Sequence, residues 1–233
     1  MISVIIPLHN KRSMIARTIN SILNQTLKDL EIIVVNDGST DDSLSVVPTL
    51  SSVIPAKAGI QMKIISGLGH FGANWARNYG AHLAQGEYLF FCDADIILKS
   101  YALEYLKNAL DKNLKASYAY CSFQLGWKKM LSRPFNAEQL KKINYISTMS
   151  LIRRKDFSGF DEKIEKFQDW DLWLTMLERG KAGVLVPEVL FYAEPARRGK
   201  SKWLPKIFYK LPWLQEVKKY NAAREIIIKK HKL

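Results

Sequence analysis

The stretch GEYLFFCDAD at residues 86–95 decides the fold class of this 233-residue chain. Its central run, residues 88–92, is apolar or aromatic throughout, which is typical of a strand buried on both faces of a sheet. Asp93 and Asp95 follow directly. Because ligands bind at the carboxyl ends of strands in open α/β sheets, these carboxylates predict a site at that edge. An isolated Asp-x-Asp is also typical of a turn with capping aspartates, so the prediction depends on the rest of the chain.

Strands of the same kind precede this segment. Residues 2–7 and 31–35 are β-branched apolar runs followed by polar turns, and residues 62–66 predict a third strand. Helices are expected between the strands, one of them at residues 73–84 and another where apolar residues recur at helical spacing, at Ile15, Ile19, Ile22 and Leu23. This alternation predicts an α/β fold with a mostly parallel central sheet, helices on both faces and a Rossmann-like nucleotide-binding half.

The second half of the chain is less regular. We expect a helix at 101–110, strands at 116–123 and 145–152, a helix at 169–180 and a last strand at 184–192. Pro187 interrupts the last strand, which predicts an edge position or a bulge there.

Charge divides the chain into two parts. The formal net charge is +13, but residues 196–233 hold 12 Lys/Arg and 2 Asp/Glu, so most of the excess lies in this tail. We therefore predict a domain at 1–195 and a basic amphipathic extension at 196–233. The extension has three interpretations: a solvated helix, a segment packed on the domain, or a segment bound to an anionic membrane surface. Nucleic acid is not expected as a partner, because the domain itself is nearly neutral and carries no nucleic-acid-binding motif.

Targeting signals are not recognisable in the sequence. No basic and apolar leader opens the chain, and no run approaches the ~20 apolar residues that span a bilayer. We expect a cytoplasmic protein, peripheral at the inner face of the cell membrane if the extension binds lipid. The two cysteines, Cys92 and Cys121, are expected to be reduced core thiols.

Several motifs occur in one order and resemble those of the family 2 glycosyltransferases, which have the GT-A fold. They are SVIIPLHN at 3–10, VNDGSTD at 35–41, ARNYG at 76–80, GEY at 86–88, DAD at 93–95 and QDWDLW at 168–173. The resemblance covers about residues 1 to 190. It implies an inverting transfer of a sugar from a nucleotide-diphosphate sugar, such as a UDP-sugar, to a hydroxyl group. The implied acceptor is a saccharide or a lipid-linked molecule of cell-envelope polysaccharide, lipopolysaccharide or glycolipid synthesis.

The resemblance also assigns site residues. Pro7, His9 and Asp37 match positions that hold the nucleotide, usually through uracil. His9 departs from the aromatic residue usual there, although an imidazole can still stack on a base. Asp93 matches the carboxylate near the ribose, and with Asp95 it matches the ligands of a divalent cation, Mn²⁺ or Mg²⁺.

Arg77, in the ARNYG motif, has two interpretations that the sequence leaves open. Its guanidinium could contact the nucleotide or its phosphates. It could equally anchor its helix to a neighbouring carboxylate.

Asp169 is the candidate catalytic base, because an inverting transfer needs a carboxylate that takes the acceptor proton, apart from the metal-binding pair. Its alternative role is to cap the helix that follows. Asp171 is expected to serve the helix dipole, and Trp170 and Trp173 to lie in the core.

Relatives in this family often carry a histidine or a basic residue after the last strand, and this chain has no histidine there, which leaves a third protein ligand of the metal unassigned. We predict phosphate contacts from Arg197, Arg198 and Lys200 instead.

Two other functions compete with this interpretation. A sugar-phosphate nucleotidyltransferase shares the sheet and the metal chemistry, but PLHN after the first strand lacks the glycines of a phosphate-binding loop. A sugar-nucleotide-binding protein without transferase activity is the second.

Overall fold

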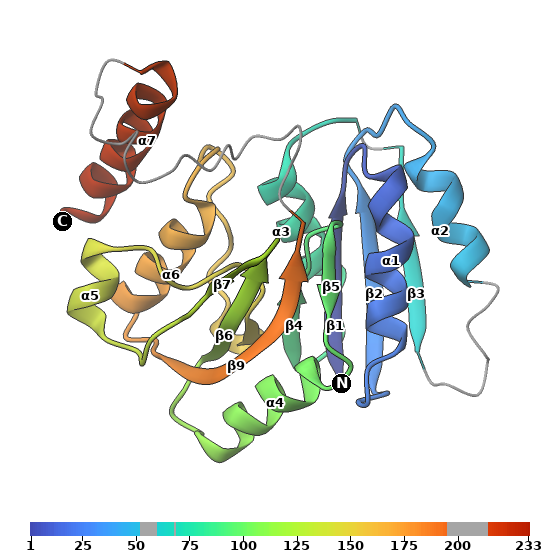
Figure 1. Cartoon of the computed structure of the whole chain (residues 1–233), viewed down its shortest axis with the longest axis horizontal. Coiled ribbons are helices and arrows are strands. Elements are labelled where there is room, and N and C mark those ends of the chain that lie inside the picture. The colour runs from blue at the N-terminus through green and yellow to red at the C-terminus, as the bar shows by residue number, and fades with distance from the viewer. Residues whose placement is uncertain (52–59, 68, 195–213) are drawn as a thin grey trace.

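The computed structural model describes residues 1–51, 60–67, 69–194 and 214–233. Within these ranges one nine-stranded sheet runs in the order β3-β2-β1-β4-β8-β6-β9-β5, with β7 paired to β6 (Figure 1). The strands are β1 (Ile2–Leu8), β2 (Leu30–Asn36), β3 (Gln61–Ile65), β4 (Tyr88–Phe91), β5 (Ile96–Leu98), β6 (Tyr118–Leu125), β7 (Lys128–Met130), β8 (Leu151–Arg153) and β9 (Gly183–Ala193). The helices are α1 (Arg12–Leu23), α2 (Ser43–Ser51), α3 (Ala73–Leu83), α4 (Ala102–Lys112), α5 (Ala137–Lys142), α6 (Gln168–Glu178) and α7 (Gln215–His231), with a 3-10 turn at Arg154–Asp156.

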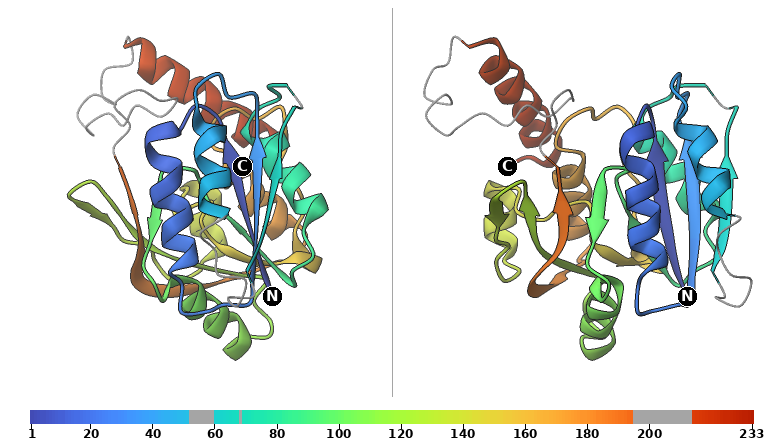
Figure 2. Two further views of the ribbon diagram at one scale, coloured as in Figure 1. Left: turned by 90° about the vertical axis from the view of Figure 1, so that its right-hand side faces the viewer. Right: turned by 45° about the vertical axis from the view of Figure 1, so that its right-hand side comes forward.

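The amino-terminal half is the predicted parallel sheet. β1 pairs in parallel with β2 and β4, and β2 with β3. Helices α1 and α2 cover one face of these strands and α3 the other (Figure 2). Alternate residues of β1 enter two separate cores: Val4 packs toward α1, whereas Ile5 packs toward α3. Gly80 lets α3 approach closely, since a Cβ there would lie 2.5 Å from Ile5 Cγ2.

The second half mixes strand directions. β8 is antiparallel to β4 and β6, β5 is antiparallel to β9, and only the β6 and β9 pairing is parallel. The register of β9 against β6 shifts around Cys121 and Ser122, opposite the segment that contains Pro187, which agrees with the predicted bulge. β5 follows Asp95 in the chain yet pairs with the end of β9. The far edge of the sheet therefore returns to the place where β4 ends.

The strand expected at 145–152 is much shorter than predicted. Only Leu151–Arg153 forms β8. The preceding residues turn instead, because the Ser150 amide donates to Thr148 O at 2.7 Å and the Ser150 hydroxyl to Ser147 O at 2.8 Å. Local serine hydrogen bonds of this kind compete with strand pairing.

The basic extension is described only from residue 214 onward. Its helix α7 packs against α6, with Val217 and Ile227 fully buried. Residues 215–231 therefore follow the interpretation in which the extension packs on the domain. The predicted boundary between domain and extension, at 195/196, lies outside the described residues. None of the described helices combines the length and apolarity that a bilayer crossing needs.

Cys92 and Cys121 are buried free thiols, as expected. Burial raises the pKa of both, to about 12 for Cys121.

Candidate active site

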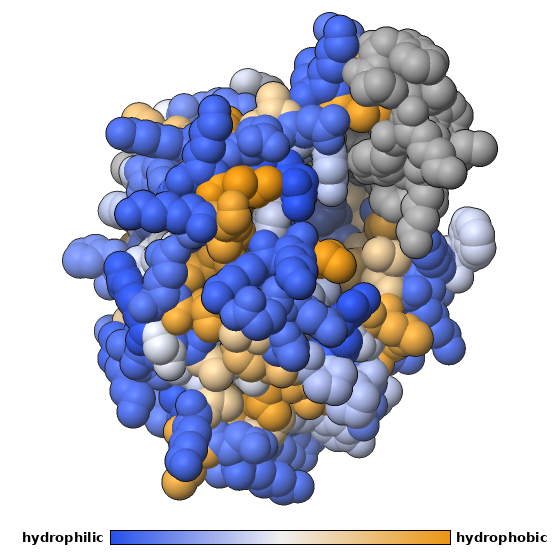
Figure 3. Space-filling view, turned by 90° about the vertical axis from the view of Figure 1, so that its left-hand side faces the viewer, coloured by the Kyte–Doolittle hydropathy of each residue, from blue (hydrophilic) through white to orange (hydrophobic). Residues whose placement is uncertain are grey.

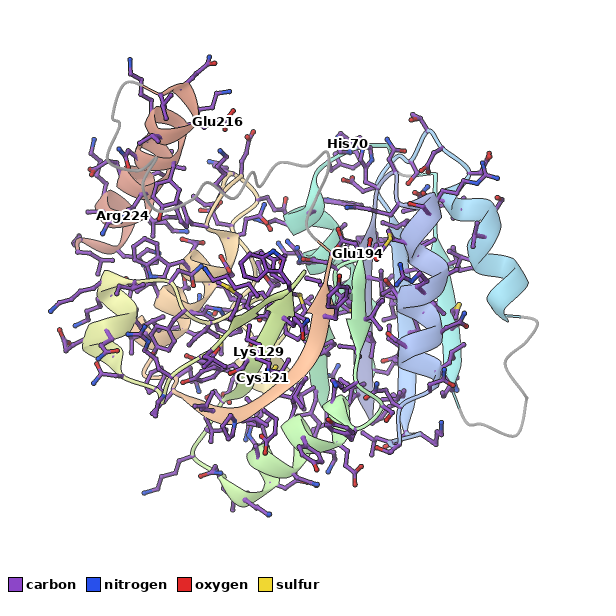
Figure 4. The ribbon with its side chains drawn as sticks, viewed as in Figure 1. His70, Cys121, Lys129, Glu194, Glu216 and Arg224 are labelled. Atoms are coloured by element: carbon purple, nitrogen blue, oxygen red, sulfur yellow. The ribbon has the colours of Figure 1, made fainter. Side chains whose placement is uncertain are left out.

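The predicted site residues gather at one edge of the sheet, where β1, β2 and β4 end. His9 follows β1, Asp37 follows β2, and Asp93 follows β4 by two residues. Pro7 lies inside β1, opposite Val35 of β2. Figure 4 labels His70 and Glu194 at this same edge, although they come from different parts of the chain.

Asp37 is the most buried of these acids, at 2% exposure. Its carboxylate accepts hydrogen bonds from the amides of Phe71, at 2.6 Å, and Gly72, at 3.1 and 3.0 Å. These amides precede α3, so Asp37 fixes the loop that leads into that helix. Gly38 lies against the same loop with φ +67°, and a Cβ on it would stand 2.9 Å from Gly69 O. Glycine is favoured at position 38 because it adopts a positive φ without strain and has no Cβ to clash with the Gly69 carbonyl oxygen.

His70 is a site residue that the sequence analysis missed. Its ring stacks on His9 with centroids 4.3 Å apart and planes inclined by 28°. His9 Nδ1 lies 2.8 Å from Asp37 O, and His70 Nδ1 lies 3.0 Å from both Asp37 O and Asp37 Oδ2. The sequence held one indication of this role: His70 follows the third parallel strand, β3, and such residues lie at the edge of the sheet where the site forms.

The side chains of His9, Asp37 and His70 also bring their nitrogen and oxygen atoms within 4.8 Å of one another, as a metal site would. Each Nδ1 lies within hydrogen-bond distance of the Asp37 carbonyl oxygen, however, and because a carbonyl oxygen only accepts, each Nδ1 carries a proton and offers no lone pair to a metal. The stacked arrangement is better suited to the face of a planar ring.

Asp93 and Asp95 stand on a turn that Thr18 secures by donating to Ala94 O at 2.9 Å. Arg77 Nη2 lies 2.7 Å from Asp93 Oδ1, and Lys11 Nζ lies 2.6 Å from Asp95 Oδ2. Both carboxylates are partly exposed, at 36% and 28%. Carboxylate oxygens are the ligands that Mg²⁺ and Mn²⁺ prefer. The turn already attracts two cationic groups, and the donor set therefore fits a divalent cation.

Arg77 is 5% exposed and anchored on several sides. In addition to Asp93 it donates to Asn74 Oδ1 at 3.0 Å and Gln168 Oε1 at 3.2 Å. These contacts support the interpretation in which Arg77 anchors its helix to a neighbouring carboxylate, Asp93. A contact between Arg77 and the nucleotide remains a prediction.

Asp169 lies in the first turn of α6, whose N-cap position is Phe167. Its Oδ1 accepts from the Trp170 amide at 2.9 Å. Burial raises the pKa of this carboxyl, although hydrogen bonds from Asn144 and Trp170 and the charge of Arg77 act in the opposite direction. A carboxylate with a raised pKa is a stronger proton acceptor, as a general base requires.

The neighbouring residues of α6 have structural roles. Trp170 and Trp173 are buried, as expected. Asp171 lies in the first turn of α6, the position expected for an acid that serves the helix dipole. It is also 2% exposed and forms ion pairs with Lys230 and His231 of α7. The three basic residues predicted to contact phosphate, Arg197, Arg198 and Lys200, lie outside the described residues.

The sequence of this chain is similar to those of known glycosyltransferases. The model of "Glycosyl transferase family 2" matches residues 3–160. A chondroitin synthase of Pasteurella multocida is 31% identical over 191 residues, which cover 78% of this chain and 19% of that protein. A GalNAc(5)-diNAcBac-PP-undecaprenol beta-1,3-glucosyltransferase of Campylobacter jejuni is 34% identical over 159 residues, which cover 68% of this chain and 49% of that protein. The chain thus spans half or less of the length of these two relatives.

Solved structures show the same fold. Residues 1–349 of S. aureus TarS in complex with UDP superpose with a TM-score of 0.70 and 19% identity, covering 83% of this chain and 60% of that one. The mannosyltransferase PcManGT of Pyrobaculum calidifontis, in complex with GDP-Man and Mn²⁺, gives 0.67 at 18% identity, covering 95% and 73%. The architecture is that of the GT-A glycosyltransferases. With more than half of its residues matched by the family model, the chain belongs to glycosyl transferase family 2.

Proposed function

We propose that this protein is an inverting glycosyltransferase that moves a sugar from a UDP-sugar to a hydroxyl acceptor. The observation that carries the proposal is the bridge made by Arg77, which bonds both Asp93 at the end of β4 and Gln168 at the start of α6. Gln168 precedes Asp169, so the acidic turn and the candidate base belong to one site. An inverting transfer needs these two acidic groups on opposite sides of the sugar.

We assign the nucleotide part of the donor to the edge of the sheet that carries Pro7, His9 and Asp37. We add His70 to these residues because its ring stacks on His9. The stacked rings of His9 and His70 offer a flat surface to a pyrimidine. Asp37 orders the loop beside it, and a carboxylate oxygen can accept a hydrogen bond from the base. TarS supports a UDP donor by analogy, because it has been solved with UDP and with UDP-GlcNAc.

The metal is assigned to Asp95 and Asp93, with Mn²⁺ or Mg²⁺ as the ion. A divalent cation bound there would neutralise charge on the diphosphate leaving group. Lys11 and Arg77 hold the two carboxylates in place and keep the turn electrically balanced. Arg197, Arg198 and Lys200 remain proposed phosphate contacts.

Asp169 is proposed to remove the proton of the acceptor hydroxyl as its oxygen attacks the anomeric carbon. The carboxylate gains the proton, and the bond between the sugar and the diphosphate breaks. No covalent sugar intermediate is required.

The acceptor is proposed to be a saccharide or a lipid-linked glycan of the cell envelope. The Campylobacter relative is named for a polyprenyl diphosphate substrate, which supports this class by analogy. Contact with an anionic membrane remains part of the proposal, through those residues of the basic extension, 196–233, that take no part in the packing of α7 on α6. Flotation with vesicles of phosphatidylglycerol and phosphatidylcholine tests it: the intact chain should float, while a full-length variant with Lys202, Lys206 and Lys210 replaced by Gln should float much less.

The central test is release of UDP from a panel of UDP-sugars, with and without Mn²⁺. Wild-type protein should release UDP in the presence of metal, and Asp95→Ala and Asp169→Asn should each lower the rate by about 100-fold or more. Asp111→Asn is a matched control, because Asp111 is a partly exposed acid on α4 paired with Lys107. Binding of UDP-sugar without turnover would instead favour a binding protein, and activity indifferent to metal and to both variants would refute the mechanism.

A further inference from the structure

Helix α7 packs beside α6 (Figure 1), and its contacts extend from Phe167, just before α6, to Glu178 at the end of that helix. Ile227 of α7 joins the same core as Trp170 and Trp173 of α6. Figure 3 views the end of the molecule that carries these helices, where hydrophilic side chains cover most of the surface and apolar groups are exposed only in strips. The outer surface at this end is mostly hydrophilic, although Ile226 of α7 is 56% exposed.

Four ion pairs fasten this junction, and the pair of His231 with Asp171 is buried on both sides. His231 Nε2 lies 2.9 Å from Asp171 Oδ1, and His231 Nδ1 lies 2.7 Å from Glu178 Oε1. Lys230 Nζ lies 2.7 Å from Asp171 Oδ1 and 2.8 Å from Asp161 Oδ2. The side chains of His231 and Asp171 are only 2% and 3% exposed. Removing one partner of a buried pair leaves the other charge uncompensated, which makes such pairs costly to break.

Aromatic contacts continue the junction around the start of α6. Tyr220 meets the Phe167 ring edge to face, with centroids 5.0 Å apart. The guanidinium of Arg224 lies 5.8 Å from the centroid of Trp170. Phe167 has φ 60°, a left-handed conformation that costs a non-glycine residue about 1 kcal/mol and persists only where its surroundings hold it.

The other side of the same segment is tied to the nucleotide half. Asn74 of α3 donates to Asp161 O at 2.8 Å and Ile164 O at 3.0 Å, and it also accepts from Arg77. Residues 161–171 are thus held between α3 and α7. Asp169 lies inside this segment, with contacts of α7 at positions 167, 170 and 171 on either side of it.

We propose that α7 is a brace that positions the Asp169 carboxylate, with His231 and Lys230 as positioning residues. The inference rests on the proposed role of Asp169 as general base. A misplacement of about 1 Å in a reacting group can cost on the order of 100-fold in rate. Docked α7 fixes the backbone on both sides of Asp169, and undocked α7 releases it.

The test uses the full chain with His231→Ala and Lys230→Ala. Lys229→Ala is the matched control, since Lys229 is an exposed lysine next to Lys230 that takes no part in these pairs. Hydrogen exchange should show lost protection at residues 160–173 in both variants, with unchanged protection in β1 and β2. UDP release from UDP-GlcNAc should fall about tenfold or more, while UDP affinity stays within about twofold. Lys230→Arg keeps the charge and should restore most of the rate.

A brace and a merely stabilising contact give different results. Global loss of protection with an unchanged UDP release rate would show that α7 only stabilises the fold and would overturn the proposal. Wild-type exchange at 160–173 in both variants would overturn it as well. Full activity of Asp169→Asn would refute the base assignment itself, whereas an inactive Asp169→Asn beside fully active His231→Ala and Lys230→Ala would refute the brace alone.

Discussion

Lys11 Nζ and Asp95 Oδ2 lie 2.6 Å apart, so the residue assigned to the metal already forms an ion pair with a lysine of the same chain. Lys11 directly precedes α1, and its own amide donates to Ser43 at 2.7 Å, which fixes the backbone from which the side chain reaches Asp95. A divalent cation bound at Asp95, as proposed, would compete with this ammonium group. We therefore expect Lys11 to lower the affinity of the acidic turn for metal.

Replacement of Lys11 by Gln should strengthen Mn²⁺ binding. Removing a positive charge from the ligand should lower the apparent Kd for Mn²⁺ about tenfold, measured by electron paramagnetic resonance of free Mn²⁺ in the presence of UDP. Arg12→Gln is the control, because Arg12 pairs with Asp42 in an exposed position. Weaker Mn²⁺ binding in Lys11→Gln would mean that the lysine assists the site rather than competing for it.

Replacement of His70 by Ala should weaken UDP binding. Loss of one stacking partner typically costs about 1 to 3 kcal/mol per base, or roughly 5-fold to 150-fold in Kd. His70→Phe should retain most of the affinity, because it keeps an aromatic face. Isothermal titration calorimetry with UDP measures both variants, and His82→Ala on the exposed side of α3 serves as control. Equal Kd values for His70→Ala and wild type would remove His70 from the base site.

The pH dependence of transfer should report on Asp169. Its pKa is raised above 3.8 by burial, so kcat/KM should fall on the acid side with an apparent pKa above that value. Protonation fills the lone pair that accepts the hydroxyl proton, and the rate drops. UDP release measured from about pH 4 to 8 tests this. An acid limb at or below 3.8 would contradict a base with a raised pKa.

Docking of α7 should weaken as pH rises through the neutral range. Burial alone would lower the pKa of His231, but its hydrogen bonds to Asp171 and Glu178 outweigh this and raise the pKa above 6.5. A folded-state pKa above the unfolded value means that the stabilisation is fully present below pH 6.5 and is lost as the pH rises through the higher folded-state pKa. The facing groups are Asp171 and Glu178 of α6, with Lys230 beside Asp171.

Urea unfolding of wild type and His231→Ala at several pH values measures this effect. Taking the difference between the two proteins cancels the other titrating groups. The difference in unfolding free energy should be largest near pH 6 and shrink toward pH 9. A difference that grows with pH would contradict a stabilising imidazolium.

The sequence by itself determined the nucleotide half of this protein. Continuous apolar strands that alternate with helices favour a mostly parallel sheet with both faces covered, so the order of strands and helices up to Cys92 follows from the hydrophobic pattern. Polar side chains placed after parallel strands meet at one edge of the sheet, and His9, Asp37 and Asp93 do so.

The tertiary structure alone decided which side chains pair across that edge. The partners lie too far apart in the chain for any helical or strand spacing to relate them. They are His70 with His9, Lys11 with Asp95, and Arg77 with Asp93 and Gln168. The role of α7 was hidden for the same reason. A basic, aromatic tail has the same composition whether it packs on lipid or on protein, and only the pairing of His231 and Lys230 with Asp171 distinguishes the two for residues 215–231. Hydrophobic periodicity fixes elements, whereas contacts between residues far apart in the chain are fixed by how those elements pack.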